Sequence, residues 1–461
     1  MKIIILGGNR VGGALAENLA HENHDITVVD ISSNCLNELK HRFDIQTIYG
    51  SGSHPDILEA ANAADADLLI AVTDNDEVNL VACQAAYSLF NVPTKIARIR
   101  ATQYMNYPAL FGSQHLPVDV FISPEELITD RVKQLIEHPG TLQVLNFSNG
   151  QVKLVAVKPV YGGPLVNKTV AEIHDFVDVE TRIVAIYHGG HPIVPNDDTI
   201  IQVGDEVFFL AASNDINKTL TALGRSEQRY RSVVIAGGGN IGLRLAKALE
   251  KDYQVKVIDR NKKCTDRIAA ELDHATVLHG DTSDREMLIN ENIENADVFV
   301  AVTNDDENNI MSCMLSKRLG VRRVMALITH TAYVDLIEGS DIDIAISPQQ
   351  ATISAILRYV RRGDIVNVYS LRRGAAEAIE IISHGDKNSS KIVGRTVKEI
   401  KLPPGSIIGA VTRGDEVIMA YDELMIEPDD HVILFVVNKK HTQEIEKLFQ
   451  VNLGFFSLLK N

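Results

Sequence analysis

A glycine-rich turn, Gly237 to Gly242, combines residue types that can hold a phosphate group. It follows an apolar run, Val233 to Ala236, and precedes an amphipathic segment, so the G-x-G-x-x-G pattern lies between a predicted strand and a predicted helix. Gly237 permits a tight turn, Gly239 lets a phosphate approach the backbone, and Gly242 lets helix and strand pack closely. The helix N-terminus then offers free N–H groups to an anion. We predict that every residue of the turn contacts a nucleotide: Gly237, Gly238, Gly239, Asn240, Ile241 and Gly242.

An aspartate at the end of the next predicted strand extends this nucleotide site. Asp259 follows the segment Gln254 to Ile258, about 20 residues beyond the turn, where a carboxylate accepts hydrogen bonds from ribose hydroxyls. Its charge repels a 2′-phosphate, which argues against NADP. The aspartate does not separate NAD from ATP or ADP, because all three carry an adenosine ribose and a diphosphate.

The N-terminal half repeats the same pattern, with Gly7 and Gly237 standing 230 residues apart. The predicted contacts of this first copy are the turn residues and the aspartate that ends the next strand: Gly7, Gly8, Asn9, Arg10, Val11, Gly12 and Asp30. Asn9 replaces the second glycine of the pattern. Asparagine tolerates a left-handed backbone better than most residues, so the turn is expected to survive. Its side chain is expected to crowd a bound diphosphate.

A polar loop follows the fourth predicted strand of each half. It carries Thr73 and Asp74 in the first half and Thr303 and Asn304 in the second. In open α/β sheets a ligand lies beyond the carboxyl ends of the strands, so these side chains should flank the nucleotide. The alternative interpretation is an ordinary helix N-cap ahead of Glu77 and its counterpart.

Two arginines distinguish the first half. Arg98 and Arg100 alternate on an apolar segment, which would place both guanidinium groups on one face of a strand. Phosphates are natural partners for such a pair, and a salt bridge within the fold is the alternative. The matching segment of the second half, Val324 to Ile328, has no arginine. The first site is therefore expected to hold more phosphate charge than the second.

The repeat, together with short alternating segments separated by glycine and proline in the remaining sequence, predicts four domains of α/β class. Two Rossmann-like domains with doubly wound parallel sheets cover residues 1–123 and 231–348, and each is followed by a small α+β domain, at 142–226 and 366–452. A polar segment, residues 224–231, is the expected linker between the halves.

Composition excludes several classes of protein. A formal net charge of −16 argues against nucleic-acid partners, which need basic surface. No apolar run reaches the roughly 18 residues of a membrane span, and the start MKIIILGG is an expected strand rather than a signal peptide, so we expect a cytoplasmic protein without direct membrane insertion. The four cysteines form no C-x-x-C pair and are expected to be small, reduced and buried.

Groups needed for catalysis are missing from the sequence pattern. There is no G-x-x-x-x-G-K-[ST] phosphate loop, no cluster with metal-ligand spacing, and no evident proton donor in the small domains. Two nucleotide folds without catalytic machinery indicate a sensor rather than an enzyme, so no catalytic or metal-binding residue is predicted.

Several segments together resemble a known family. The openings KIIILGGNRVGGALAENL and VVIAGGGNIGLRLAKAL, the loop TNDDENN and the segment ISPQQATISAI are similar to the regulatory subunits of Trk-type potassium uptake systems, which carry tandem RCK domains, also called KTN domains. The resemblance covers nearly the whole chain. It implies a regulatory protein that binds NAD(H) and also ATP or ADP. The implied nucleotide contacts of the first half are residues 7–11, Asp30, Thr73, Asp74 and Arg98. Those of the second half are residues 237–241, Asp259, Thr303 and Asn304.

The same resemblance implies the protein's partners. Members of the family form a homotetrameric ring on the cytoplasmic face of the inner membrane, against a potassium-translocating subunit of the TrkH or TrkG type. Two alternatives stay open at this point. One is an NAD-dependent oxidoreductase with a duplicated cofactor fold, and the other is a sensor subunit for another cation transporter.

Overall fold

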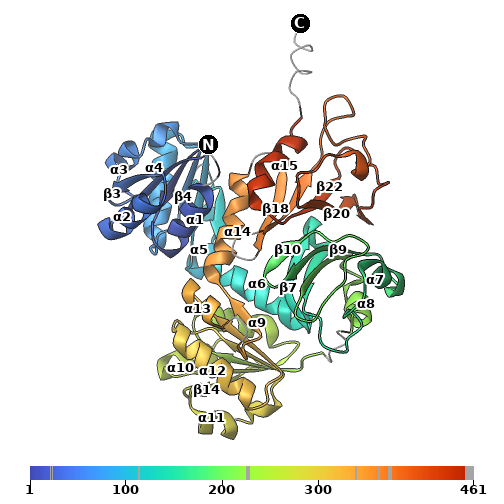
Figure 1. Ribbon diagram of the computed structural model, residues 1–461. Helices are drawn as coiled ribbons and strands as arrows, with labels where there is room; N and C mark the ends of the chain where they lie inside the picture. The colour runs from blue at the N-terminus through green and yellow to red at the C-terminus, as the bar shows by residue number, and fades with distance from the viewer. Residues whose placement is uncertain are drawn as a thin grey trace. The chain divides into compact units, whose positions relative to one another are not determined.

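A computed structural model describes residues 1–20, 22, 24–112, 115–224, 229–337, 340–361, 364–371 and 376–451 (Figure 1). These residues form two compact units. One consists of Met1–Leu127 together with Gln349–Val360, and the other of Ile128–Pro348 together with Arg361–Asn461.

A six-stranded parallel sheet forms the frame of the first unit. Its order is β3-β2-β1-β4-β5-β6, so the strand order reverses between β1 and β4, although all six strands run parallel. The strands are β1 (Lys2–Leu6), β2 (Asp25–Asp30), β3 (Gln46–Tyr49), β4 (Leu68–Ala71), β5 (Thr94–Arg98) and β6 (Val120–Ile122). Its helical segments are α1 (Arg10–Ala20), α2 (Ser33–Arg42), α3 (Pro55–Ala60), η1 (Ala63–Asp65), α4 (Asp76–Phe90), α5 (Thr102–Met105) and η2 (Pro108–Leu110).

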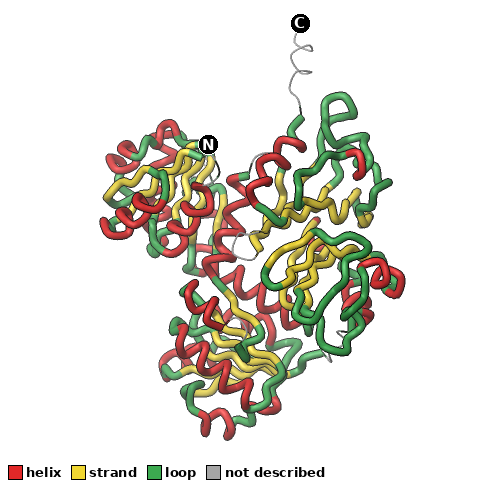
Figure 2. Tube along the Cα trace, viewed as in Figure 1, coloured by secondary structure: helices red, strands yellow, loops and turns green. Residues whose placement is uncertain are grey.

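Two further helices belong to the frame around this sheet. Helix α6 (Pro124–Glu137) begins in the first unit, and α14 (Pro348–Val360) lies almost wholly in it although it comes from far along the chain. The inner strands are continuous apolar runs with both faces buried, as expected where helices cover a parallel sheet on both sides (Figure 2).

The second unit contains a parallel sheet of the same design. Its order is β14-β13-β12-β15-β16-β17. The strands are β12 (Ser232–Ala236), β13 (Gln254–Asp259), β14 (Thr276–His279), β15 (Val298–Ala301), β16 (Arg323–Leu327) and β17 (Ile344–Ile346). The helical segments are α9 (Asn240–Leu249), α10 (Lys262–Ala269), α11 (Arg285–Asn290), η4 (Ile293–Asn295), α12 (Asp306–Arg318) and α13 (Thr331–Ile337).

Two five-stranded antiparallel sheets complete the second unit. The first, in the order β10-β9-β11-β8-β7, contains β7 (Thr141–Phe147), β8 (Val152–Val157), β9 (Thr181–His188), β10 (His191–Ile193) and β11 (Glu206–Ala212), with η3 (Ser148–Gly150), α7 (Val170–Phe176) and α8 (Ile216–Ala222). The second, in the order β18-β19-β22-β20-β21, contains β18 (Ile365–Leu371), β19 (Ala376–Ile382), β20 (Ser406–Arg413), β21 (Glu416–Met419) and β22 (His431–Val436), with η6 (Val397–Glu399), η7 (Lys439–His441) and α15 (Thr442–Phe449).

The two antiparallel sheets share one hydrophobic core. Phe147 and Leu210 of the first sheet pack in the same cluster as Leu371 and Phe435 of the second. A buried polar contact accompanies it: the Glu380 carboxylate accepts hydrogen bonds from the Ser148 N–H at 3.0 Å and its hydroxyl at 3.3 Å. Residues more than two hundred positions apart are therefore held together by both apolar and polar contacts.

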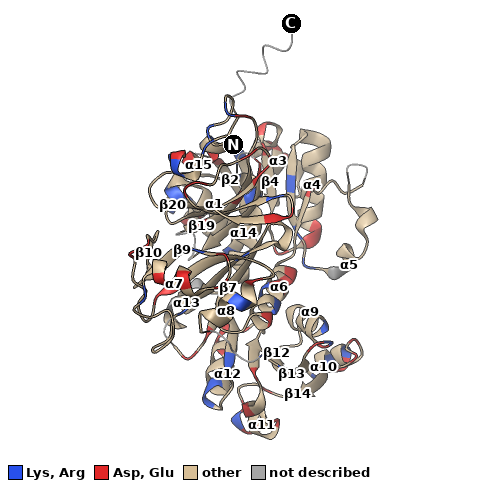
Figure 3. Cartoon of the chain, turned by 90° about the vertical axis from the view of Figure 1, so that its right-hand side faces the viewer, with Lys and Arg blue, Asp and Glu red and all other residues tan. Residues whose placement is uncertain are grey.

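The predicted fold class is confirmed: each half has a Rossmann-like parallel sheet followed by a smaller antiparallel α+β arrangement. The four domain boundaries stay a prediction. Residues 225–228 of the predicted linker, and the predicted domain ends at 226 and 452, lie outside the described residues. Within the described part of the chain, no helix has the length and apolar character needed to cross a membrane. Basic and acidic residues are interspersed along the helices in the view of Figure 3.

Candidate functional site

The glycine turns have the geometry expected of a phosphate-binding turn. Gly7 and Gly237 have φ of +96° and +107°, a region that favours glycine. A Cβ on Gly12 would lie 1.8 Å from the Gly7 carbonyl oxygen, and one on Gly242 would lie 1.8 Å from the Gly237 oxygen. The roles predicted for the first and last glycines, a tight turn and close packing of helix on strand, are therefore confirmed.

The second position of the turn lacks the left-handed backbone assumed for it. Gly239 has φ −64° and ψ −167°, and a Cβ on it would meet nothing within 4 Å. Asn9 likewise does not belong to the residues with positive φ. The premise that Asn9 stands in a left-handed backbone is therefore wrong, whereas the crowding of a diphosphate by its side chain stays a prediction.

Helices α1 and α9 begin directly after these turns. Arg10 and Val11 lie in the first turn of α1, and Asn240 and Ile241 lie in the first turn of α9. The first N–H groups of a helix have no partner within it and point along its axis. The predicted residues therefore present backbone donors at the carboxyl end of each sheet.

The two predicted aspartates are tied to the turns beside them. Asp30 Oδ2 accepts from the Gly8 N–H at 2.6 Å and its Oδ1 from the Ser32 N–H at 2.7 Å. Asp259 Oδ2 accepts from the Gly238 N–H at 2.7 Å. Each carboxylate oxygen has a second lone pair, so a fixed carboxylate can still accept a ribose hydroxyl.

A cysteine thiol contacts a backbone carbonyl of each glycine turn. The Cys35 thiol lies 2.9 Å from the Gly8 carbonyl oxygen, and the Cys264 thiol lies 3.1 Å from that of Gly238. Burial and the neighbouring aspartate raise the pKa of both thiols, so both stay protonated donors. The other two cysteines, Cys83 and Cys313, are buried in matching helices; burial raises the pKa of Cys83 to about 12.

The loops after β4 and β15 are held by asparagines that the sequence prediction missed. Asn79 Oδ1 accepts from the Thr73 hydroxyl at 2.6 Å and its N–H at 3.0 Å, while Asn79 Nδ2 donates to the carbonyls of Thr73 and Arg98. Asn309 repeats this arrangement with Thr303. Both asparagines are fully buried inside a helix, and their recurrence at the repeat spacing was a signal in the sequence.

Buried aspartates hold the next loop in the same way. Asp76 accepts from the N–H groups of Arg100 and Ala101, and Asp306 accepts from those of Thr329 and His330.

The alternative interpretation of the loops after β4 and β15 as helix N-caps is only half right. The capping side chains are Asn75 and Asp305, whereas the threonines are bonded to the asparagines.

The two arginines of the first half do not form the predicted pair on one strand. Strand β5 ends at Arg98, so Arg100 lies beyond it and pairs with Glu125 at 3.0 Å. Arg98 Nη1 lies 3.1 Å from Asp74 Oδ1. Both arginines therefore have a carboxylate within the fold, as the alternative interpretation expected, and only Arg98 lies beside the predicted loop.

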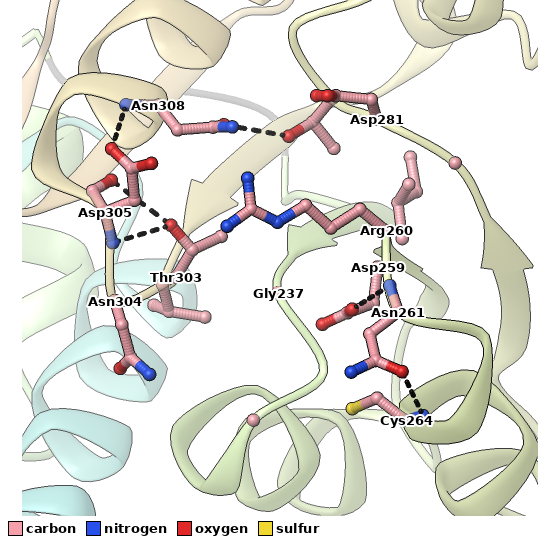
Figure 4. Close-up of a pocket in the computed structure, with 15 residues that line it drawn as sticks. Gly237, Asp259, Arg260, Asn261, Cys264, Asp281, Thr303, Asn304, Asp305 and Asn308 are labelled. Atoms are coloured by element: carbon pink, nitrogen blue, oxygen red, sulfur yellow. Dashed lines mark hydrogen bonds between the residues drawn. The ribbon is translucent and has the colours of Figure 1, made fainter.

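The second half has an open cavity of about 350 Å³ at the carboxyl end of its sheet. Its lining includes predicted residues from the turn, the aspartate and the loop: Gly237, Gly239, Asp259, Thr303 and Asn304. Figure 4 shows Thr303, Asn304 and Asp305 on one side and Asp259, Asn261 and Cys264 on the other. A cavity of this size at a strand-order reversal is typical of a small-molecule site.

Arg260 lines this cavity, so the second cleft has an arginine even though the strand that matches β5 ends without one. Its side chain extends across the opening toward the Thr303 side (Figure 4). Arg260 directly follows Asp259, and the matching residue after Asp30 is the exposed Ile31. Hydrogen bonds from Ser283 and the Arg260 charge keep the pKa of Asp281 below its usual range. The pattern of the fifth strand does not reveal it, because Arg260 follows the second strand of its half.

The residues of both halves fit a nucleotide. Each site offers extended backbone at the second turn position, helix N–H groups, a fixed carboxylate and an anchored polar loop. Among the residues that the structure describes, no group of His, Cys, Asp or Glu side chains is arranged to hold a metal ion.

Comparison with known proteins is consistent with this architecture. The TrkA-N domain model matches residues 3–124 and 233–348, and the TrkA-C domain model matches 154–224 and 386–450. The Trk system potassium uptake protein TrkA of Halomonas elongata is 56% identical over 458 residues, covering 99% of this chain and 100% of that protein. The TrkA of Vibrio alginolyticus is 54% identical and covers 98% and 99%, and that of Haemophilus influenzae is 47% identical and covers 99% and 100%.

Solved structures share the fold at low sequence identity. The GsuK RCK domain superposes with a TM-score of 0.60 at 19% identity, covering 97% of this chain and 94% of that chain. The GsuK channel bound to NAD gives a TM-score of 0.60 at 18% identity, covering 97% and 78%.

Each half thus combines a TrkA-N domain with a Rossmann-like fold and a TrkA-C domain in the small α+β arrangement, and the GsuK RCK domain shares this fold. The chain's relatives match along their full length at up to 56% identity. The chain belongs to the family of the Trk system potassium uptake protein TrkA.

Proposed function

We propose that the chain is a nucleotide-binding regulatory subunit that gates potassium flux through a membrane partner. The observation that carries this proposal is the duplicated site. In each half a glycine turn, a fixed aspartate and an anchored threonine loop converge at the carboxyl end of a parallel sheet.

The ligands are NAD(H) and ATP or ADP, all of which present the ribose and diphosphate that this arrangement fits. The predicted contacts are the residues of the turns, the aspartates and the loops. In the first half these are residues 7–12, Asp30, Thr73, Asp74 and Arg98, and in the second residues 237–242, Asp259, Thr303 and Asn304. Arg100 leaves the set because it pairs with Glu125.

The partner is a potassium-translocating membrane subunit of the TrkH or TrkG type, and the chain acts as a homotetramer on the cytoplasmic face of the inner membrane. The name and the full-length identity of the relatives support this assignment. A sensor subunit for another cation transporter is the competing form of the same function.

The chain's role is regulatory rather than enzymatic. The thiols beside the turns stay protonated, and the turn aspartates already accept backbone hydrogen bonds, so none of these groups is set up as a base or nucleophile. The competing enzyme is an NAD-dependent oxidoreductase, for which a panel of metabolites would cause a steady change in nicotinamide absorbance.

The proposed switch requires a ligand that binds two conformations with different affinity. A tenfold preference supplies about 1.4 kcal/mol per site, and four coupled sites reach several kcal/mol.

The decisive experiment measures potassium flux in vesicles that contain the membrane subunit and this chain, with ATP, ADP or NADH added. We expect flux to change with at least one nucleotide, and Asp30→Ala and Asp259→Ala to differ in which nucleotide loses its effect. Flux that is indifferent to every nucleotide would refute the proposal.

A further inference from the structure

Asp74 lies between the glycine turn and the end of β5 at the first site, which we call the first cleft. Its Oδ1 lies 3.1 Å from Arg98 Nη1, and its Oδ2 accepts a hydrogen bond from Asn9 Nδ2 at 2.8 Å. One carboxylate thus joins the glycine turn to the end of β5. We call this chain of contacts, Asn9–Asp74–Arg98, the carboxylate bridge.

The carboxylate bridge stands at the turn itself. Asn9 is the residue directly before the first residue of α1, where free helix N–H groups face an anion. Because its own amide group reaches Asp74, the carboxylate lies within one side chain's length of those donors. Its two oxygens resemble two oxygens of a phosphate in charge and spacing.

Arg98 is not fully satisfied by this contact. Its side chain is only 12% exposed, and its Nε is buried without a hydrogen-bond partner. A guanidinium group has five donors, so Arg98 can gain hydrogen bonds from a ligand with more acceptor oxygens than a carboxylate. Asp74, by contrast, is 68% exposed, and water can solvate it once it leaves.

The second cleft has no such bridge. The matching positions are Gly239, Asn304 and Leu327, which supply neither a charged partner nor a side chain at the turn. The correspondence of Leu327 to Arg98 is given by the buried asparagines, because Asn309 donates to the Leu327 carbonyl as Asn79 donates to that of Arg98. The bridge is therefore a property of the first cleft alone.

We propose that Asp74 is an internal competitor for the phosphate-binding position of the first cleft, and that an incoming phosphate displaces its carboxylate from Arg98 and Asn9. This inference rests on the proposed function, since it requires a nucleotide in that cleft. The carboxylate repels every phosphate group that approaches. Only an anion that binds the guanidinium group more tightly displaces it from Arg98. Asp74 is thus a specificity-determining residue that sets the affinity according to ligand charge.

Displacement also changes the protein. Asp74 immediately precedes Asn75, whose side chain caps α4 by accepting from the Val78 N–H at 2.8 Å. Once the carboxylate leaves Asn9, the loop that leads into α4 loses the hydrogen bond that joins it to the Asn9 side chain. Ligand binding is thereby coupled to the start of a long helix.

The test is calorimetric titration of the full chain carrying Asp259→Ala, so that the first cleft alone keeps its ribose carboxylate. ATP, ADP and adenosine are the probes. Asp74→Asn should tighten ATP binding by about three- to fivefold, as expected for an exposed ion pair, tighten ADP binding less, and leave adenosine unchanged. Asp74→Ala should give the same order among the three ligands.

A matched control transfers the carboxylate to the other cleft. In the full chain carrying Asp30→Ala, Asn304→Asp should weaken ATP binding more than adenosine binding. Weaker or unchanged ATP binding in Asp74→Asn, or an equal change for adenosine, overturns the inference alone. If neither the unsubstituted chain nor any of these variants binds any of the three ligands, the proposed binding of ATP or ADP fails together with this inference.

Discussion

The two clefts share the residues that fix their backbone, which we call the frame, and differ in the side chains at their opening, which we call the mouth. Glycine turn, aspartate, cysteine, threonine and buried asparagine recur in both halves with the same hydrogen bonds. At the mouth the first cleft has the carboxylate bridge, whereas the second has an open cavity with Arg260. The residues that shape the backbone are thus duplicated, and the charged residues at the openings, which we propose meet the ligand, have diverged.

The largest expected effect tests whether the frame is shared. Gly12→Ala and Gly242→Ala place a Cβ 1.8 Å from a backbone oxygen, so each should cost at least about 3 kcal/mol of unfolding free energy. Gly239→Ala is the matched control and should change stability little, because nothing lies near its Cβ position. Urea denaturation measures all three. A stable Gly242→Ala variant would contradict the common frame.

The buried asparagines provide the next test. Asn79→Ala and Asn309→Ala remove the side chain that accepts from a threonine N–H and donates to two carbonyls, so each should destabilise the protein by about 1–3 kcal/mol. Similar losses in thermal and urea unfolding are expected from the two variants. A loss confined to one of them would show that the loops are anchored differently in the two halves.

The arginines test the divergence at the mouth. Arg98→Ala should weaken the binding of ATP in the first cleft more than that of NADH, by about three- to tenfold. The reason is that Arg98 is proposed to contact the terminal phosphate of ATP. Arg260→Ala should weaken nucleotides in the second cleft only, and Ile31→Arg should raise ATP affinity in the first. Calorimetry with each nucleotide measures these affinities. Equal losses of ATP and NADH in Arg98→Ala would refute the charge argument.

The smallest effect concerns the thiols. Because burial and the adjacent aspartate raise the pKa of Cys35 and Cys264, both should react with iodoacetamide more slowly than free cysteine at pH 8, and faster as the pH rises toward and beyond 9. Cys264 lines the open cavity, so ATP should protect it. Mass spectrometry of alkylated peptides follows both rates. Rapid alkylation of Cys264 at pH 7 in the presence of ATP would contradict this picture.

Much of the frame was predictable because it depends on local patterns. The glycine turns, the aspartates that end the second strands and the doubly wound parallel sheets all follow from apolar runs and a fixed spacing. Asn79 and Asp76 escaped prediction because they bind backbone groups that adjoin them only in the folded protein. Their recurrence in the second half at the same spacing would have identified them.

The errors at the mouth have a common physical origin. Asn9 was judged by a left-handed backbone that the extended second position of the turn does not have. The Arg98 and Arg100 pair was predicted from strand alternation, but β5 ends between them. Arg260 was missed because the side chains of one cleft come from several strand ends, and no single segment displays them together.

The shared core of the two antiparallel sheets has a further consequence. In a protein built from separate identical subunits, one gene sequence must serve both faces of such a contact, and every substitution occurs twice. Here Ser148 and Glu380 belong to the same chain but to different copies of the repeat, so each face is encoded independently. A mutation can alter one partner while the other stays unchanged. Because both repeats lie in one chain, the two halves can take on different roles.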